Sequence, residues 1–272
     1  MLLSSCSDDD GVDGVPSYIR VESFDIETTT TEGTDRQDIK DVWVQAGNNF
    51  IGAFELPATI PILKEGPTDL ELRAGVLQDG ISTTRSRYPF LQAYDITTNL
   101  EKKEVKEIEP VVGYNPRTDF IWMERFASED NLTIEETNDS HVEFEITQES
   151  DEVYEGDGSF KATLEEEGNL IEVASKETFQ IDPNQPAFME LHYRSDIEIR
   201  IGAIAHIGNE IRPVLKMGLN PNEEWTKIYV YLSDFIGNNV APYPFRIFIG
   251  ARNPNNETNE VFLDNIKLLR FE

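Results

Sequence analysis

The chain has 272 residues, of which 52 are Asp or Glu and 23 are Lys or Arg, so its net charge at pH 7 is −29. A charge of this sign argues against nucleic acid as a partner, because the phosphate backbone would be repelled. The hydrophobic content of 39% and the aromatic content of 10% are typical of folded β-rich domains and unlike those of disordered chains. We interpret the charge as a solvated acidic surface, with divalent-cation binding as an alternative.

The N-terminus carries the most specific motif. Leu2-Leu3-Ser4-Ser5 places an apolar pair and two small residues directly before Cys6, the only cysteine, and Ser7, Asp8, Asp9 and Asp10 follow it. The segment resembles the lipobox of bacterial lipoproteins, and the acidic run resembles the surface-export signal of Bacteroidota lipoproteins. The resemblance implies that Cys6 is the acylated first residue of a mature protein anchored at the outer membrane and exposed on the cell surface. The alternative is a free thiol on a frayed terminus.

Turn residues and strand patterns divide the rest of the chain. Residues 1–16 are expected to be a signal remnant followed by an acidic tether that ends at Pro16. Residues 17–112 and 118–272 each contain short alternating strand patterns, and Gly113-Tyr114-Asn115-Pro116 is typical of a linker between them. The sequence therefore predicts an all-β protein with two β-sandwich domains. No stretch after Cys6 approaches the ~18 apolar residues of a membrane span.

The first domain is predicted from its alternating strands. Strands are expected around residues 19–26, 39–44, 50–56 and 70–76, with a hairpin turn at 47–49 and an edge or crossover at 57–61, which contains two prolines. Residues 42–44, 52–57 and 88–90 resemble those of Ig-like or carboxypeptidase-regulatory-like modules of Bacteroidota surface lipoproteins. The resemblance implies a spacer. Trp43 lies inside an apolar strand, so we expect it in the core, with sugar stacking as the alternative.

Four segments of the second domain carry a further resemblance. They are an opening strand at 119–126, a Gly-rich turn and strand at 155–164, a strand at 222–232 with Glu224-Trp225-Thr226-Lys227, and a terminal strand at 261–268 with Leu263-Asp264-Asn265-Ile266. In this order they resemble the galactose-binding-like jelly roll shared by many carbohydrate-binding modules. The resemblance covers most of residues 118–272 and implies the fold more than the function.

Strand alternation within this domain predicts a ligand-binding face. Met189, Leu191 and Tyr193 should face the core, as should the alternate residues of 197–201 and 226–232. If these strands share one sheet, the opposite face gathers the candidate ligand-binding residues His192, Arg194, Arg200, Tyr229 and Tyr231, together with Glu190 and Glu198. Aromatic rings that stack on sugars and charged groups that bind hydroxyls suit glycan binding. The alternative is an ordinary exposed face with cross-strand Glu–Arg pairs.

The catalytic motifs that we considered are absent from the sequence. It contains no Gly-x-Ser-x-Gly, no Walker loop and no His-Glu-x-x-His, and His141, His192 and His206 lack zinc-ligand spacing. We therefore expect no enzymatic activity, although the abundant carboxylates leave a glycosidase-like pair open. The resemblance to galactose-binding-like domains implies a structural Ca²⁺ as a cofactor, held by the carboxylates of Glu124 and Asp264 and by backbone carbonyls of the stretch from Gly158 to Lys161.

The sequence thus predicts a non-catalytic, surface-exposed lipoprotein of the outer membrane that binds glycan through its C-terminal jelly roll. The alternative is an accessory or adhesin-type lipoprotein that binds a protein partner in an outer-membrane complex. A groove with aromatic and convergent polar groups would favour glycan, whereas a flat apolar patch of more than a few hundred Å² would favour protein.

Overall fold

The computed structural model describes residues 14–272. Strands dominate this part of the chain, and its helices are limited to α1 (Ser233–Asn239) and a single 3₁₀ turn at Glu129–Asn131. This confirms the all-β prediction. Cys6, Ser7 and Asp8–Asp10 lie outside the described residues, so the lipid-anchor and export-signal predictions are unaffected by the fold.

The chain forms two compact units. The N-terminal unit contains the described residues up to Glu27 together with Ile39–Val76 and Arg85–Tyr114. The C-terminal unit contains Asn115–Glu272 and also two earlier segments, Thr28–Asp38 and Leu77–Thr84. The main division falls inside the linker predicted around 113–116. The two earlier segments differ from the predicted boundaries, which placed them in the first domain.

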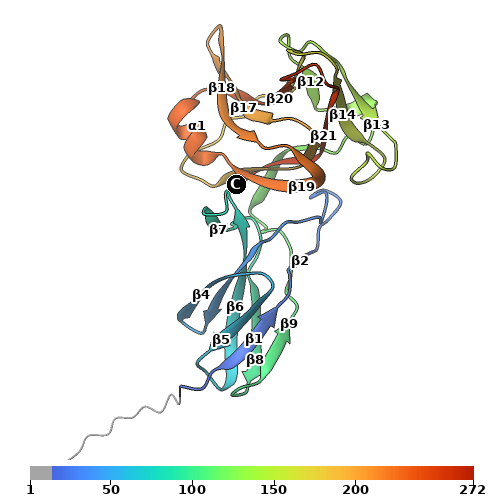
Figure 1. Ribbon diagram of the computed structural model, residues 1–272. Helices are drawn as coiled ribbons and strands as arrows, with labels where there is room; N and C mark the ends of the chain where they lie inside the picture. The colour runs from blue at the N-terminus through green and yellow to red at the C-terminus, as the bar shows by residue number, and fades with distance from the viewer. Residues whose placement is uncertain (1–13) are drawn as a thin grey trace, which may run out of the picture. The chain divides into compact units, whose positions relative to one another are not determined.

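The N-terminal unit is built from two principal sheets, labelled in Figure 1. One has the strand order β5 (Ala58–Ile62), β1 (Ser17–Val21) and β9 (Val105–Ile108). The other has the order β4 (Asn49–Glu55), β3 (Asp41–Ala46), β6 (Gly66–Leu77) and β7 (Arg85–Arg87), with β8 (Tyr94–Leu100) also paired to β6. A small separate pair joins β2 (Asp25–Ile26) to β10 (Val111–Val112). The predicted edge position of residues 57–61 is correct, because β5 lies at the end of its sheet.

Alternation along the strands fixes the core of this unit. Val42 and Val44 of β3 have no exposed surface, and Leu72 of β6 is equally buried. Neighbouring residues of a strand point to opposite faces, so Trp43 lies on the face away from this core and is only half-buried. The expectation that Trp43 belongs to the core is therefore wrong.

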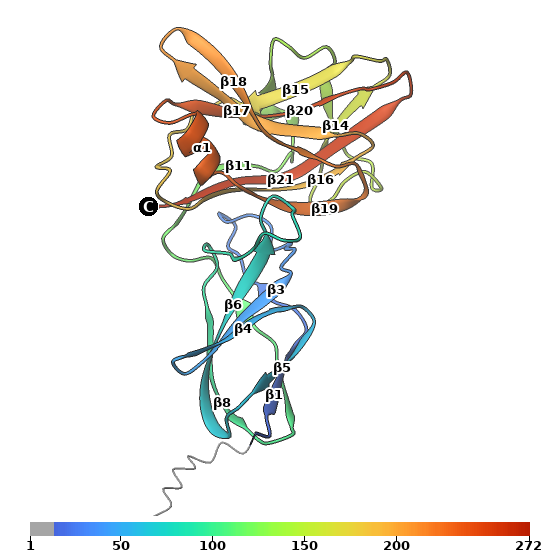
Figure 2. The same cartoon turned by 60° about the vertical axis from the view of Figure 1, so that its left-hand side comes forward.

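The C-terminal unit is a sandwich of two sheets, which Figure 2 shows as two layers. We call the first the β16 sheet. It contains β13 (Phe144–Thr147), β14 (Ser159–Leu164), β21 (Asn259–Phe271), β16 (Ala187–Ser195) and β19 (Asn222–Tyr231) in this order, with β11 (Thr118–Glu124) also paired to β21. The second, the β17 sheet, has the order β12 (Ile134–Glu136), β15 (Leu170–Ser175), β20 (Phe245–Arg252), β17 (Ile199–Ile207) and β18 (Glu210–Leu219).

The core of the sandwich lies between these sheets. Met189 and Leu191 of β16 and Val230 of β19 pack in one cluster with Ile199 and Ile201 of β17. The predicted core side of each of these strands is therefore confirmed. Among residues 14–272, no helix has the length and apolar character required to cross a membrane.

Candidate functional site

The predicted ligand residues of β16 and β19 do point away from the sandwich core. Glu190, His192 and Arg194 alternate with the core residues of β16, and Tyr229 and Tyr231 alternate with those of β19. However, His192 and Tyr229 are only 1% and 3% exposed. The expectation that this face is open is therefore wrong, because other parts of the C-terminal unit cover it.

The segment Thr28–Asp38 supplies part of this cover. Lys227 Nζ donates to Arg36 O at 2.8 Å, and Lys267 Nζ donates to Thr34 O at 2.9 Å. Asp38 N donates to Tyr229 Oη at 3.2 Å. The ammonium groups of two lysines from different strands therefore donate hydrogen bonds to backbone carbonyls of this segment. This explains why the segment belongs to the C-terminal unit.

The segment Leu77–Thr84 covers the neighbouring edge. Asp79 N donates to Tyr229 O at 2.9 Å, and Tyr231 N donates to Asp79 Oδ1 at 3.0 Å. Lys216 Nζ binds the other carboxylate oxygen of Asp79 at 2.7 Å. The segment thus continues the hydrogen bonding of the β16 sheet beyond its last strand, β19. We call the outer surface at Glu190, His192, Lys227, Tyr229 and Lys267 the covered face.

The covered face contains buried ionisable groups. Lys227 Nζ lies 2.7 Å from Glu190 Oε2, and their side chains are 4% and 1% exposed. Burial lowers the pKa of Lys267 to about 8, and burial raises the pKa of the Tyr229 hydroxyl well above its usual range. A buried ion pair of this kind requires both partners, because either charge alone would be costly in the interior. These groups therefore have a structural role in closing the face.

His192 is held as a neutral ring on the covered face. Its imidazole stacks on the Tyr154 ring, with the centroids 4.3 Å apart. Within the described part of the chain, neither ring nitrogen has a hydrogen-bond partner. Burial is the main cause that lowers the pKa of His192 to about 2. His192 is consequently not available to an external ligand as the face is arranged here.

Arg194 and Tyr231 lie nearer to solvent. The Arg194 guanidinium lies 4.1 Å from the centroid of the Phe262 ring, and its Nη1 donates to Asp151 O at 3.1 Å. Arg194 also lines a shallow pocket of about 280 Å³ whose other charged residues are Asp196, Glu223 and Glu260. The half-buried ring of Tyr231 packs against Phe188, with 5.1 Å between centroids. The other charged residues of the pocket beside Arg194 are acidic, and its aromatic residue, Phe262, is buried.

Arg200 is separated from the other predicted ligand residues. It belongs to β17, which lies in the second sheet and not beside β16. The premise that these strands share one sheet is therefore wrong, because β16 and β19 belong to one layer of the sandwich and β17 to the other. Arg200 is exposed, and its Nε binds Glu198 Oε1 at 2.9 Å.

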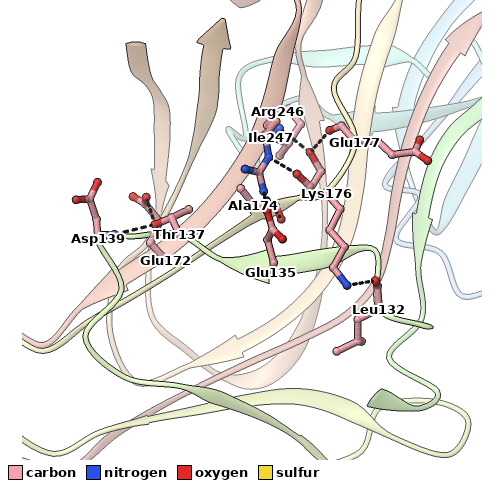
Figure 3. Close-up of polar contacts among 11 residues, drawn as sticks. Leu132, Glu135, Thr137, Asp139, Glu172, Ala174, Lys176, Glu177, Arg246 and Ile247 are labelled. Carbon is pink, nitrogen blue, oxygen red and sulfur yellow. Dashed lines mark hydrogen bonds and ion pairs between the residues drawn. The ribbon is translucent and has the colours of Figure 1, made fainter. Parts of the chain in front are cut away.

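The outer face of the β17 sheet is lined by such polar pairs. Figure 3 shows Arg246 with Glu135 and Thr137 with Glu172. Their distances are 2.8 Å from Arg246 Nη2 to Glu135 Oε1 and 2.7 Å from Thr137 Oγ1 to Glu172 Oε1. Donors and acceptors of this face therefore satisfy one another, although β15 lies between the strands of Arg246 and Glu135, and Arg200 pairs with Glu198 of its own segment.

The side chains of the predicted calcium residues have protein partners. Glu124 Oε1 accepts from the backbone of Arg125 and Phe126 at 2.9 and 3.0 Å, and Oε2 accepts from Thr133 Oγ1 at 2.8 Å. Lys161 Nζ binds Glu152 at 2.5 Å, whereas the calcium prediction concerns the backbone carbonyls of Gly158 to Lys161. Between residues 14 and 272, no three His, Cys, Asp or Glu side chains cluster as metal ligands would. The predicted donor set of two carboxylates and backbone carbonyls would need further oxygens to reach the six to eight that Ca²⁺ prefers, and the calcium site stays a prediction.

Asp264 and the Gly-rich turn form a hydrogen-bonded network. Asp264 Oδ2 accepts from Ser159 Oγ at 2.7 Å and from Glu155 N at 3.3 Å. Burial raises the pKa of the Asp264 carboxyl to about 7. A Cβ at Gly158 would lie 2.9 Å from Phe126 O, so only glycine allows this close approach. The residues predicted as ligands thus tie the turn to β21.

A larger open pocket, which the sequence did not reveal, lies at one end of the sandwich. We call it the end pocket. Its volume is about 860 Å³. Phe179 and Ile121 supply apolar surface, while Tyr243 is 40% exposed. The polar groups that line it come from Gln180, Asp182 and Arg270.

Hydrogen bonds fix the walls of the end pocket. The loop before β16 is pinned to β20 by reciprocal backbone bonds between Phe179 and Phe245, at 2.7 and 2.9 Å. Gln180 Nε2 donates to Pro242 O at 3.1 Å, which joins this loop to the one after α1. Arg270 Nη1 donates to Gln180 O at 3.0 Å, and its Nε donates to Asp119 Oδ2 at 3.1 Å. The polar groups are therefore preorganised.

Sequence reasoning missed the end pocket because loops have no alternation to follow. Its residues come from 121, 178–183, 241–243 and 270, which are distant in the sequence. The one local signal is Tyr243, a large aromatic residue between Pro242 and Pro244. A loop tyrosine between prolines has no strand partner and is a candidate for exposure.

Comparison with known proteins gives structural similarities only. No protein-family model matches the chain, and no curated protein matches its sequence. A structure of carbohydrate-binding modules from the β-sandwich superfamily is 16% identical, with a TM-score of 0.42 and coverage of 93% of this chain and 98% of the other.

Two single modules align with a smaller part of the chain. The family 11 carbohydrate-binding module from Clostridium thermocellum, in complex with a β-1,3-1,4-mixed-linked tetrasaccharide, is 14% identical with a TM-score of 0.39, over 56% of this chain and 94% of that one. The xylan-binding domain of family 22 is 9% identical with a TM-score of 0.38, over 56% of this chain and 95% of that one. At these values the similarities assign neither a ligand nor a binding residue to this chain.

Proposed function

We propose that this protein is a non-catalytic lipoprotein, anchored in the outer membrane and exposed at the cell surface, that binds glycan through the end pocket of its C-terminal sandwich. The observation that carries the proposal is the pocket itself, in which exposed Tyr243 stands beside fixed polar groups of Gln180, Asp182 and Arg270. Its volume of about 860 Å³ is within the usual range for small-molecule sites.

The chemistry of these groups suits a sugar. The Tyr243 ring offers a flat apolar face on which the C–H face of a sugar can stack. Arg270 offers planar donors whose orientation Asp119 and the backbone already fix. Hydrogen bonds from the backbone and side chain of Asn184 lower the pKa of Asp182, so Asp182 is a carboxylate that accepts hydrogen bonds from hydroxyls.

The end pocket is favoured over the face that the sequence suggested. His192 and Tyr229 lie beneath the segments Thr28–Asp38 and Leu77–Thr84, so a glycan would have to displace both segments to reach them. Displacement would also separate the ammonium groups of Lys227 and Lys267 from their carbonyl partners. The end pocket requires no such rearrangement.

The glycan proposal is tested by an array of neutral and acidic oligosaccharides probed with wild type, Tyr243→Ala and Tyr243→Phe. The Phe variant is the matched control, because it keeps the ring and removes only the hydroxyl. We expect Tyr243→Ala to weaken binding about tenfold or more, with Tyr243→Phe much closer to wild type. A wild-type protein that binds no glycan would contradict the proposal.

The membrane anchor is supported by the sequence around Cys6 and is tested separately. Full-length protein should fractionate with membranes, and Cys6→Ala should release it. Replacing Asp8, Asp9 and Asp10 with Ala should leave the protein in the membrane but reduce its digestion by protease added outside the cell. Equal digestion of wild type and the triple variant would contradict the export signal.

A protein partner is the second candidate function, and one observation favours it. Ile211 and Leu215, on the edge strand β18, are 69% and 54% exposed. Exposed apolar residues on an unpaired edge suit pairing with another chain. Cell-surface cross-linking with wild type and with Ile211→Asp distinguishes the two functions, since only a partner that docks on β18 would be lost from the variant.

A further inference from the structure

The N-terminal unit has an aromatic surface of its own, centred on Trp43. This residue lies on the outer face of the sheet that contains β3, β4 and β6. Its β4 neighbour across the strand pair is Ala53, which is small and exposed, and its β6 neighbour is Arg73. A half-buried tryptophan on an outer sheet face contributes little to the core, so its position calls for another explanation.

The backbone of β6 lets the indole lie close to the sheet. A Cβ at Gly75 would lie 2.8 Å from Trp43 Nε1 and 2.9 Å from Asp41 Cβ, so any larger residue would push the ring away. Nε1 itself is buried and has no protein hydrogen-bond partner within residues 14–272. The polar edge of the ring is therefore buried, while the residue as a whole remains partly exposed.

A second ring and a guanidinium extend this surface. The Phe50 ring is 60% exposed, and its centroid lies 5.8 Å from that of Trp43 with 31° between the planes. The Arg87 guanidinium lies 5.6 Å from the Trp43 ring centroid, and its charge also acts on Glu71. Arg87 is thus a donor group beside the rings. We call Trp43, Phe50, Arg73, Arg85 and Arg87 the Trp43 face.

The charges around the indole balance one another. Arg73 forms a bidentate pair with Glu71, at 2.7 and 3.0 Å. Arg85 binds Asp41 and also Glu55, the latter at 3.0 Å. The carboxylates next to Trp43 therefore already have arginine partners, on a chain whose net charge is −29. A polyanion would be repelled by the chain as a whole, and a polycation would find no free carboxylate among these pairs.

We propose that the Trp43 face is a second binding site, which takes a neutral polysaccharide. Two adjacent rings offer stacking surfaces for successive sugar units, and paired arginine and carboxylate groups bind hydroxyls as donors and acceptors. The proposal does not rest on the end pocket of the C-terminal unit. It gives the N-terminal unit a recognition role in place of the spacer role that the sequence suggested.

The test is affinity electrophoresis of the full chain in gels that contain hydroxyethyl cellulose, arabinoxylan or galactomannan, with polygalacturonate as the anionic comparison. It uses Tyr243→Ala as the background, so that binding at the end pocket is removed. We expect at least one neutral polysaccharide to retard this protein, and Trp43→Ala in the same background to raise the dissociation constant about tenfold or more. Polygalacturonate should not retard either protein.

A fluorescence measurement keeps the test valid if Trp43→Ala disturbs folding. The retarding polysaccharide should shift the tryptophan emission of the Tyr243→Ala protein, and Trp43→Phe, which keeps a ring at the site, should abolish the shift. Unchanged retardation after Trp43→Ala, or no retardation by any neutral polysaccharide, would overturn the proposal. So would a wild-type dimer that Trp43→Ala dissociates, because the face would then bind a second copy of the chain.

Discussion

The covered face and the end pocket belong to the same sandwich and contain similar residues, yet only one of them is open. Each brings together aromatic rings, a positive charge and a carboxylate. On the covered face, Lys227 and Lys267 bind the backbone of Thr28–Asp38. In the end pocket, Tyr243 remains 40% exposed. Residue types that could bind a sugar can thus equally close a protein surface, and exposure decides between the two roles.

The largest effect should come from breaking the buried ion pair of the covered face. Lys227→Met removes the ammonium group that lies 2.7 Å from the buried carboxylate of Glu190, and we expect the free energy of unfolding to fall by about 3–5 kcal/mol. Urea denaturation measures this. Adding Glu190→Gln should restore part of the loss, since the buried carboxylate that Lys227 neutralises is then removed, while Lys267 keeps its bond to Thr34 O.

The matched control is the exposed pair of the β17 sheet. Arg200→Met breaks the bond to Glu198, whose side chain is 54% exposed. The expected change is about 0–1 kcal/mol, because solvent screens such pairs. Equal losses from Lys227→Met and Arg200→Met would show that the covered face is not buried in solution.

The covered face should also make stability depend on pH. The pKa of His192 is about 2 in the folded protein, against an ordinary value of 6.5. The unfolded chain therefore binds more protons than the folded one between these values, and His192 contributes stability that is lost as pH falls from about 6.5 towards 2.

Asp264 changes the stability with pH in the opposite direction. Its folded pKa is about 7, against an ordinary value of 3.8, so its contribution falls as pH rises from about 4 to 7. The two effects oppose each other between about pH 4 and 6.5, and only that of His192 acts below pH 4. Urea denaturation of wild type and His192→Phe at a series of pH values should show a shallower loss for the variant below pH 4. Parallel curves there would contradict a buried neutral His192.

A smaller effect should come from the hydroxyl of Tyr229. Tyr229→Phe removes the acceptor of Asp38 N, which lies 3.2 Å away, and keeps the ring. The expected loss is about 0.5–1.5 kcal/mol, as for other hydrogen bonds with a backbone partner. Amide exchange at Asp38 should speed up at the same time. An unchanged exchange rate at Asp38 would contradict the contact between the Thr28–Asp38 segment and Tyr229.

The comparison also shows which features the sequence could predict. Alternation correctly placed Met189, Leu191 and Val230 in the core, because side-chain direction follows directly from strand geometry. It could not show that Arg36 lies against Lys227, a contact that spans 191 residues. Neither could it place β16 and β17 in different sheets, since sheet order depends on topology. The same limit hid the end pocket, which only the folded loops bring together.

Binding at the end pocket is the central claim, and the most direct test compares two variants on the oligosaccharide that binds wild type most tightly on the array. Titration calorimetry with Tyr243→Ala should show affinity reduced about tenfold or more, with the melting temperature unchanged. Arg194→Ala, which alters the face that the sequence suggested, should stay within about twofold of wild type. The opposite pattern, with affinity lost in Arg194→Ala and kept in Tyr243→Ala, would contradict the account and move the site to the β16 sheet.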